Sequence, residues 1–164
     1  MMAFRPGPML PWALLAVPVV VLDQVTKRLA LELLVPHQPV PVLPGFNLTL
    51  MFNPGAAFSF LSDASGWQRW FFTAVALVVS AAIVVWLQRL PAGSRWLAAA
   101  LALILGGALG NLWDRLALGH VVDFIQIYYD RWSWPAFNLA DSAITVGAVM
   151  LVIDALRARH RGQA

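Results

Sequence analysis

Two aspartates, Asp123 and Asp141, lie in sequence surroundings where a carboxylate is unusual. Asp141 is about one turn inside the apolar stretch 136–156, and Asp123 lies in the apolar segment HVVDFIQIYY. A carboxylate at bilayer depth is costly and is by default a candidate functional group. Two neighbouring carboxylates hold one shared proton, so one can act as a base on water while the other protonates a carbonyl oxygen. These residues predict an aspartic-protease arrangement, built without a metal or a cofactor.

The same side chains also have structural interpretations. Asp141 could cap a helix N-terminus with Asn138 nearby, and the helix dipole there would favour its charged form. Asp123 could be a loop carboxylate at the membrane interface. Asp114 and Arg115 are adjacent in sequence, and adjacent helical residues point to different faces, so each would need its own partner.

Three further features have structural explanations. Asp23 and Lys27 are four residues apart and could form an ion pair, with the lysine side chain extending toward water. The segment GGALG, residues 106–110, is expected to be a close helix-packing face. Asp154 lies close to three arginines and is expected to be structural.

The composition indicates a membrane protein. Of 164 residues, 60% are hydrophobic and 12% are charged, whereas a soluble domain has about 25% charged residues. The net charge of +3 does not indicate a nucleic-acid partner, because the basic residues form no basic face interleaved with aromatics. The chain has no cysteine, and its three histidines are far apart, so no metal-ligand spacing is present.

Four apolar segments, at about 12–34, 70–87, 96–113 and 137–156, are each close to the roughly 20 residues that cross a bilayer. Such segments must be helical in lipid. The first resembles a signal peptide but lacks a small-x-small cleavage site before Asp23, so we expect it to be retained. The sequence therefore predicts an all-α integral membrane protein with four transmembrane helices, forming one domain over residues 1–164.

Basic residues fix the expected orientation. Arg5, the loop 88–95 and the tail 157–164 carry most of them, so both termini and this loop are expected in the cytoplasm, although Lys27 and Arg28 count against the rule. The outer connection 35–68 contains FNLTLMFN, where apolar and polar residues alternate, and it alone is predicted to form strands. A small outer β-subdomain is thus expected between the first two helices. The other outer connection, 114–135, is rich in Tyr and Trp and is expected at headgroup level.

On this topology the unexplained polar residues fall at one depth, on the outer side of the membrane. Besides the two aspartates and Gln24, they are Asp23, Lys27, Asn53, Asn111, Asp114, Arg115 and Asn138. Their convergence predicts a single site.

Five blocks in order resemble the lipoprotein signal peptidase family, bacterial signal peptidase II. They are LDQVTK (22–27), FNPGAAFSFL (52–61), GGALGNLWDRL (106–116), HVVDFI (120–125) and FNLADSAI (137–144). The resemblance implies a four-helix peptidase of the bacterial cytoplasmic (inner) membrane with its active site at the outer face. It implies cleavage of diacylglyceryl-modified prolipoproteins on the N-terminal side of the lipidated cysteine.

The resemblance also implies roles for individual residues. The family's catalytic aspartates fall on Asp123 and Asp141, and its supporting polar positions fall on the seven other residues named above, Gln24 excepted. Membrane lipids are expected partners, and the family's inhibitor globomycin is expected to occupy the aspartate pair.

Two other functions are compatible with carboxylates in a membrane. A small proton-coupled transporter subunit would use them as a proton relay, but the inner halves of the last three apolar segments are almost purely apolar. A structural or assembly subunit would use them only to pair with Lys27 and Arg115. Cleavage of a diacylglyceryl-modified prolipoprotein discriminates the peptidase from both.

Overall fold

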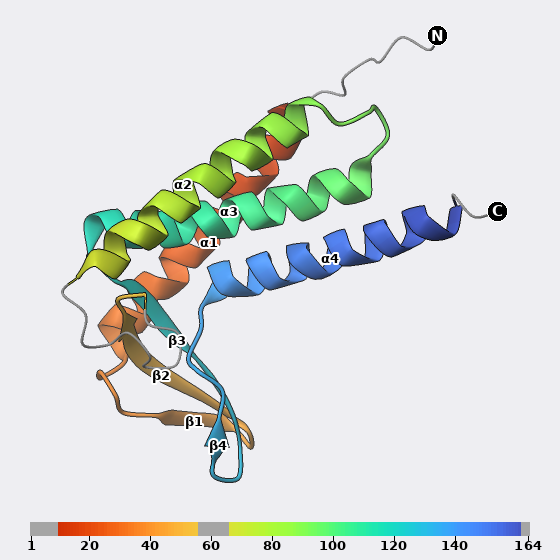
Figure 1. The fold of residues 1–164 in the computed structure, drawn as a ribbon. Coiled ribbons are helices and arrows are strands. Elements are labelled where there is room, and N and C mark those ends of the chain that lie inside the picture. The colour runs from red at the N-terminus through yellow and green to blue at the C-terminus, as the bar shows by residue number, and fades with distance from the viewer. Residues whose placement is uncertain (1–9, 56–65, 162–164) are drawn as a thin grey trace, which may run out of the picture.

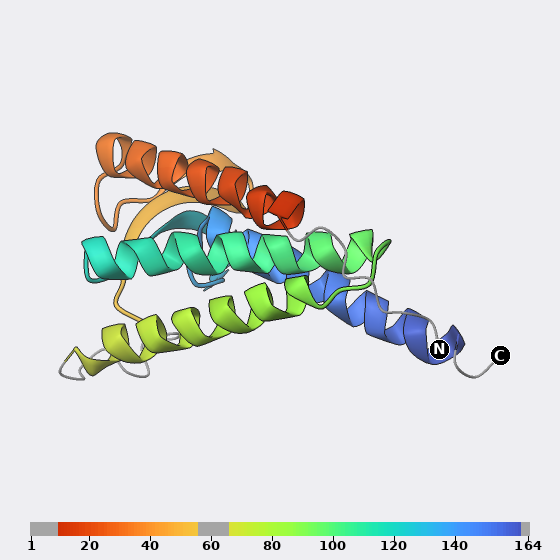
Figure 2. The same ribbon diagram turned by 90° about the horizontal axis from the view of Figure 1, so that it is seen from above.

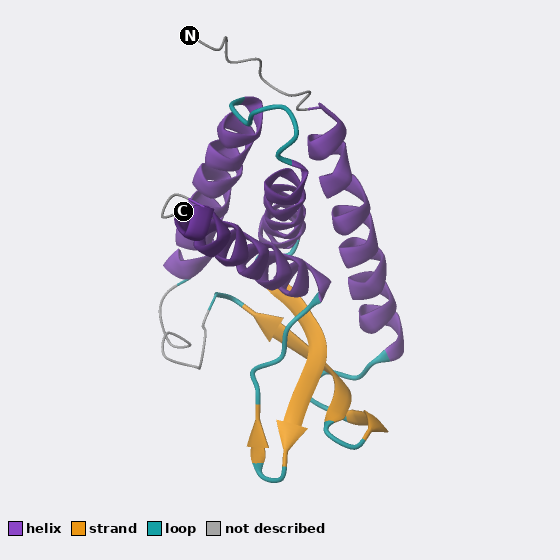
Figure 3. Ribbon diagram, turned by 90° about the vertical axis from the view of Figure 1, so that its right-hand side faces the viewer, coloured by secondary structure: helices purple, strands orange, loops and turns teal. Residues whose placement is uncertain are grey.

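The computed structural model describes residues 10–55 and 66–161, which form a helix bundle with a sheet at one end (Figures 1 and 3). In these ranges the helices are α1 (Leu10–Leu33), α2 (Trp67–Gln88), α3 (Arg95–Ala117) and α4 (Leu139–Arg161). The strands are β1 (Val40–Leu43), β2 (Phe46–Asn53), β3 (Val121–Tyr129) and β4 (Trp132–Ser133). Arg5 and residues 56–61 of the FNPGAAFSFL block lie outside the described residues.

The central helix is α3, which packs against the other three helices (Figure 2). In its most apolar 18-residue stretch 61% of the residues are buried, against 28% in α2 and 11% in α4. Small residues allow this packing: a Cβ added at Gly106 would lie 2.6 Å from Cβ of Val19, and one at Gly147 would lie 2.6 Å from the carbonyl oxygen of Ala100. The GGALG segment is therefore a close packing face, as predicted.

Among the described residues, the helices long and apolar enough to cross a membrane are α2, α3 and α4, the last over Leu139–Ala158. Their outward side chains are apolar and exposed, for example Val78 (69%) and Val152 (59%). Such surfaces suit lipid rather than water. The chain is therefore a multi-pass membrane protein. The helix α1, whose second half carries Asp23 and Lys27, is not among these helices.

The sheet is antiparallel, with strand order β1-β2-β3-β4. Its two central strands come from different connections: β2 follows α1, whereas β3 follows α3, and Phe46 pairs with Ile127 while Asn53 pairs with Val121. The prediction that only 35–68 forms strands, in a subdomain between the first two helices, is therefore wrong. The first four residues of β3 are buried on both faces of the strand, so the segment lacks the alternation that revealed β2.

A small apolar core joins the sheet to the bundle. It consists of Ala30 of α1, Leu50 of β2, and Val122 and Phe124 of β3, all buried. Val122 and Phe124 flank Asp123, so this core holds β3 at the ends of the helices and sets the position of the carboxylate between them. We call this end of the bundle the sheet end, and the opposite end, where α1 begins and α4 ends, the far end (Figure 1).

Candidate active site

The two aspartates come from different elements and meet at the sheet end. Asp123 lies in the buried part of β3, is only 2% exposed and pairs in register with Met51. Asp141 lies in the first turn of α4 and is half-buried. The segment before α4 pairs with β3, because Phe137 exchanges backbone hydrogen bonds with Ile125 at 2.9 and 3.0 Å. This pairing brings the start of α4 beside Asp123.

Asn138 connects the two carboxylates. Its side-chain amide donates to Oδ1 of Asp123 at 2.7 Å, and its side-chain oxygen accepts the backbone N–H of Asp141 at 2.9 Å. In return, Oδ2 of Asp141 accepts the backbone N–H of Asn138 at 3.2 Å. These reciprocal bonds form a capping box in which Asn138 is the N-cap residue of α4 and Asp141 occupies its third position. The interpretation of Asp141 as the N-cap residue is therefore wrong in its assignment, because Asn138 holds that position and Asp141 completes the box. The other oxygen of Asp141 accepts a hydrogen bond from a second partner.

Two further asparagines complete the carboxylate contacts. Asn53, at the end of β2, donates to Oδ2 of Asp123 at 3.1 Å. Asn111 of α3 donates to Oδ1 of Asp141 at 2.8 Å, while its oxygen accepts from Asn138 at 3.1 Å. Each oxygen of both carboxylates thus accepts a hydrogen bond from one of three asparagines. Amide donors hold a carboxylate in place without neutralising it.

Beneath this layer lies a buried ionic triad. The ammonium of Lys27 is 2.8 Å from Oδ2 of Asp23 and 2.8 Å from Oδ2 of Asp114, and it donates to Asn111 at 2.9 Å. The predicted pair of Asp23 and Lys27 is present, but the lysine does not extend toward water: it is 2% exposed. Two carboxylates and an amide oxygen satisfy its three donors, so burial is compensated.

The triad also fixes the backbone next to both candidate catalytic residues. Oδ1 of Asp23 accepts the N–H of Ala140 at 2.9 Å, and Oδ2 of Asp114 accepts the N–H of Val122 at 3.1 Å. Ala140 and Val122 directly precede Asp141 and Asp123 in the sequence. One charged cluster between α1 and α3 therefore positions β3 and the start of α4 together.

Sequence reasoning left Gln24 out of the predicted site. Its side-chain amide donates to Oδ1 of Asp114 at 2.8 Å and lies 3.2 Å from the carbonyl oxygen of Gly110. The sequence analysis counted it among the polar residues at one depth but did not include it among the predicted site residues. It belongs to the support of the triad.

Arg115 follows Asp114 on α3 and borders the site. One of its nitrogens donates to the carbonyl oxygen of Asn111 at 3.2 Å, and its guanidinium lies 5.5 Å from the ring centroid of Phe72. The guanidinium interacts electrostatically with both Asp123 and Asp141. Its Nε is buried and has no hydrogen-bond partner among the described residues. Asp114 and Arg115 have separate partners, as expected for adjacent helical positions.

The electrostatic surroundings favour one proton on the pair. Burial, and after it the nearby charge of Asp141, raises the pKa of Asp123, and the net value is about 7. Hydrogen bonds from Asn53 and Asn138, together with the charge of Lys27, oppose this shift. Near neutral pH, Asp123 is therefore poised between its acid and its carboxylate form, which is what an acid–base pair requires.

An apolar cavity of about 540 Å³ adjoins Asp141. Trp132 and Trp134 of the β3–β4 hairpin line one side, with their ring centroids 5.6 Å apart, and Thr145 and Val146 of α4 line the other. A bound molecule could thus place an apolar part here and a peptide bond near the carboxylates. Within residues 10–55 and 66–161, no group of three or more His, Cys, Asp or Glu side chains is arranged to hold a metal ion.

All nine predicted site residues lie in this region: Asn138 directly precedes α4, and the other eight lie on α1, β2, α3, β3 and α4. The profile of the family described as signal peptidase (SPase) II matches residues 15–157, almost the whole chain. This chain belongs to the signal peptidase II family. It is therefore a membrane peptidase, and the alternative of a proton-coupled transporter has no support from the matched proteins.

Individual relatives are similar over nearly their whole length. The chain is 60% identical over 157 residues to the lipoprotein signal peptidase of Pseudomonas aeruginosa strain PAO1, covering 94% of this chain and 93% of that protein. It is 54% identical to the lipoprotein signal peptidase of Pseudomonas syringae pv. tomato, covering 94% and 90%.

Solved structures are also similar. A bacterial membrane enzyme determined by the in meso method at 2.3 Å resolution has a TM-score of 0.81 at 32% identity, covering 94% of this chain and 92% of that one. A second such structure, at 1.9 Å resolution, has a TM-score of 0.79 at 32% identity, covering 93% and 97%. Both structures are of bacterial membrane enzymes, which agrees with the assignment of this chain to a family of membrane peptidases.

Proposed function

We propose that this peptidase removes the signal peptide from diacylglyceryl-modified prolipoproteins, cutting on the N-terminal side of the lipidated cysteine. Its similar relatives are named lipoprotein signal peptidases. The observation that carries the proposal is the connection of Asp123 and Asp141 through one side chain, that of Asn138. Two carboxylates held this way, one of them with a pKa raised to about 7, fit a hydrolase that activates water between them.

In this mechanism Asp141 is the base and Asp123 is the acid. A water attacks the carbonyl carbon of the scissile bond and gives a proton to Asp141, while Asp123 protonates the carbonyl oxygen. The resulting gem-diol then collapses: the C–N bond breaks, the cysteine nitrogen takes the proton from Asp141, and Asp123 regains a proton from a diol hydroxyl. The pair ends with one proton, as it began.

The other polar residues support this pair. Asn53, Asn111 and Asn138 orient the carboxylates, and the triad of Asp23, Lys27 and Asp114 holds the backbone beside them. The guanidinium of Arg115 interacts electrostatically with both aspartates and can compensate negative charge that develops on the substrate.

The location of the site fits a substrate tethered to a membrane. We infer that α1 also spans the bilayer, because its outward residues, such as Leu14 (56%), Val21 (52%) and Val25 (48%), are apolar and exposed while Asp23 and Lys27 face inward. With four spans, both termini would be cytoplasmic and the sheet end would face the outer side of the bacterial inner membrane. The aspartates would then meet a peptide bond at headgroup depth.

The cavity beside Asp141 would hold an apolar part of the substrate, and surrounding lipids would complete its open side. Globomycin would compete for the aspartate pair. The sheet, with Trp132 and Trp134, would cover the bound peptide from the aqueous side. The roles of the cavity and the sheet depend on the sheet end lying at the outer membrane surface, whereas the role of globomycin rests on the family.

The test is cleavage of a diacylglyceryl-modified prolipoprotein by the purified enzyme. Asp123→Asn and Asp141→Asn should each lower kcat by at least about a thousandfold, because each removes one half of the acid–base pair. Glu32→Gln, which changes an exposed carboxylate of α1, should keep wild-type activity. Full activity in either aspartate variant would refute the pair, and loss of activity with a chelator would indicate a metal instead.

A further inference from the structure

Two adjoining cavities lie at the far end of the bundle. The first, of about 210 Å³, is lined mainly by apolar side chains, among them Trp12 of α1 and Leu87 of α2. The second, of about 380 Å³, is lined mainly by polar groups, among them Arg157 of α4. Both include residues 93–95, where α3 begins, so an apolar space and a polar space meet at Arg95.

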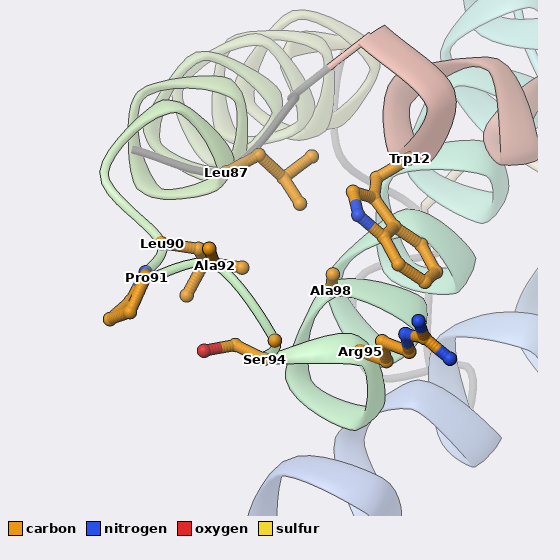
Figure 4. A pocket seen from close by; sticks show the side chains of 9 residues that line it. Trp12, Leu87, Leu90, Pro91, Ala92, Ser94, Arg95 and Ala98 are labelled. Atoms are coloured by element: carbon orange, nitrogen blue, oxygen red, sulfur yellow. The ribbon is translucent and has the colours of Figure 1, made fainter. Parts of the chain in front are cut away.

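Figure 4 shows how the apolar cavity is built from three helices. Trp12 and Leu87 lie on either side of the space, and Ala98 and Arg95 of α3 lie below them. Ala98 contributes only a methyl group, so the helices meet here without filling the space. The wall is therefore apolar up to the point where the guanidinium of Arg95 begins.

The polar cavity offers two guanidinium groups to an anion. Arg95 and Arg157 are both exposed, and within the described part of the chain neither forms an ion pair. Asp154 is the acidic side chain in the lining, so the three charged groups carry a net charge of one positive unit. Arg157 lies 5.2 Å from the ring centroid of Trp96, whose indole donates to the carbonyl oxygen of Met150 at 2.9 Å. Tryptophan favours the headgroup level of a membrane.

We propose that these two cavities together bind one anionic glycerophospholipid. Its phosphate lies between Arg95 and Arg157, since the planar guanidinium suits phosphate oxygens. The glycerol backbone and the start of an acyl chain enter the apolar cavity between α1, α2 and α3. A lipid is the occupant that needs an anion site and an apolar slot side by side, at a helix end where bilayer headgroups lie.

This site is separate from the aspartate pair, which lies at the opposite end of the bundle. The proposal depends only on the far end lying at a membrane surface and holds whether or not Asp123 and Asp141 are catalytic. The bound lipid would join the ends of all four helices, because the lining residues come from α1, α2, α3 and α4.

The test uses the purified full-length protein in detergent, titrated with phosphatidylglycerol or with phosphatidylcholine of the same chains, with binding followed by native mass spectrometry and thermal midpoint. Phosphatidylglycerol should bind and raise the midpoint, whereas phosphatidylcholine should do so much less. Arg95→Gln and Arg157→Gln should each weaken binding about fivefold, the change expected for one basic residue at an anionic lipid.

The matched control is Arg89→Gln, which removes the same charge at the same end but outside both cavities. Unchanged binding in this variant supports the site, whereas weakening equal to that of Arg95→Gln would show attraction by overall charge and overturn it. Equal stabilisation by both lipids would also overturn it.

Two further measurements test the apolar half. Ala92→Trp, at an exposed position in the lining, should fill the apolar cavity and weaken lipid binding without changing charge. Glycerol 3-phosphate, the headgroup chemistry without chains, should give no comparable stabilisation. Wild-type lipid binding in Ala92→Trp, or full stabilisation by glycerol 3-phosphate, would contradict a lipid that occupies both cavities.

Discussion

The two ends of the helix bundle are stabilised by different interactions. At the sheet end, Asp23, Lys27 and Asp114 are buried within α1 and α3 and bonded to one another. At the far end the core is apolar, with Leu101 packed among residues such as Ala98 and Leu87. The same helices thus carry a polar interior at one end and an apolar interior at the other.

This difference shows how a site can be built where burial of charge is costly. The apolar end supplies packing that does not depend on direction, whereas every polar group of the triad at the sheet end has a partner in a fixed direction. A change at the far end should therefore leave catalysis unaltered, but a change at the sheet end should alter stability and catalysis together. The predictions below test this separation.

The largest effect is expected from Lys27→Met. This change leaves Asp23 and Asp114 buried and unpaired, which should cost about 3–5 kcal/mol of unfolding free energy and abolish cleavage. Thermal unfolding and the cleavage assay measure the two effects. Arg28→Met, at the exposed neighbouring position, should have little effect on either. An active, stable Lys27→Met enzyme would show that the triad does not position the site.

Two glycines compare helix packing at the triad with helix packing outside it. A Cβ at Gly110 would lie 2.6 Å from Oδ2 of Asp23, and a Cβ at Gly147 would lie 2.6 Å from the carbonyl oxygen of Ala100. Gly110→Ala and Gly147→Ala should each destabilise the protein by about 1–3 kcal/mol through overpacking. Only Gly110→Ala should also lower kcat, because Asp23 holds the backbone of Ala140 beside Asp141. An equal loss of kcat in both variants would remove the proposed separation.

The smallest effect concerns the pH dependence of activity. Since the acid form of Asp123 is required and its pKa is raised to about 7, kcat/KM should fall as the pH rises through about 7. The hydrogen bond from Asn53 favours the charged form, so Asn53→Ala should raise the pKa of Asp123 and move this fall to higher pH. The pH profile of kcat/KM gives the result, and a shift to lower pH would contradict the assigned roles.

The Gly147→Ala variant serves as the control for this pH profile. Its substitution lies on the face of α4 that packs against Ala100 and Ile104 of α3, and neither residue contacts the carboxylate of Asp123 or Asp141 through a hydrogen bond. The midpoint of the fall in kcat/KM should therefore stay at its wild-type pH. A matching shift in this variant would mean that general loosening of the bundle, rather than the bond from Asn53, controls the proton.

The sequence was informative where a charged residue lies in an apolar segment, because the free-energy cost of that placement points to a function. Asp141 could be singled out because carboxylates are rare inside apolar helices. The predicted topology then placed the other polar residues at the same membrane depth, at one end of the bundle. Strand β3 was missed because burial on both faces removes alternation, and that pairing is what places Asp123. The burial of Lys27 could not be predicted, because a lysine near a membrane surface can also reach water, and only the positions of Asp114 and Asn111 decide between the two.

Gln24 shows a different limit. Its position beside Asp23 placed it at the same membrane depth as the predicted site. Its contact with Asp114, however, depends on how α1 and α3 are rotated against each other. That rotation follows from the close packing at the glycines of α3. The sequence indicated this packing face but did not show which helix packs against it. Local patterns therefore predicted which residues gather, and tertiary packing determined which atoms meet.

Infrared spectroscopy of the carboxylic acid C=O band tests most directly whether the aspartate pair holds a proton. Wild-type enzyme near neutral pH should show a protonated-carboxyl band that disappears as the pH rises through about 7 and is absent in Asp123→Asn. The band should persist in Glu32→Gln. If Asp123→Asn leaves the band unchanged, or if the band is lost only near the usual aspartate pKa of 3.8, Asp123 does not carry the proton and the two-aspartate mechanism is wrong.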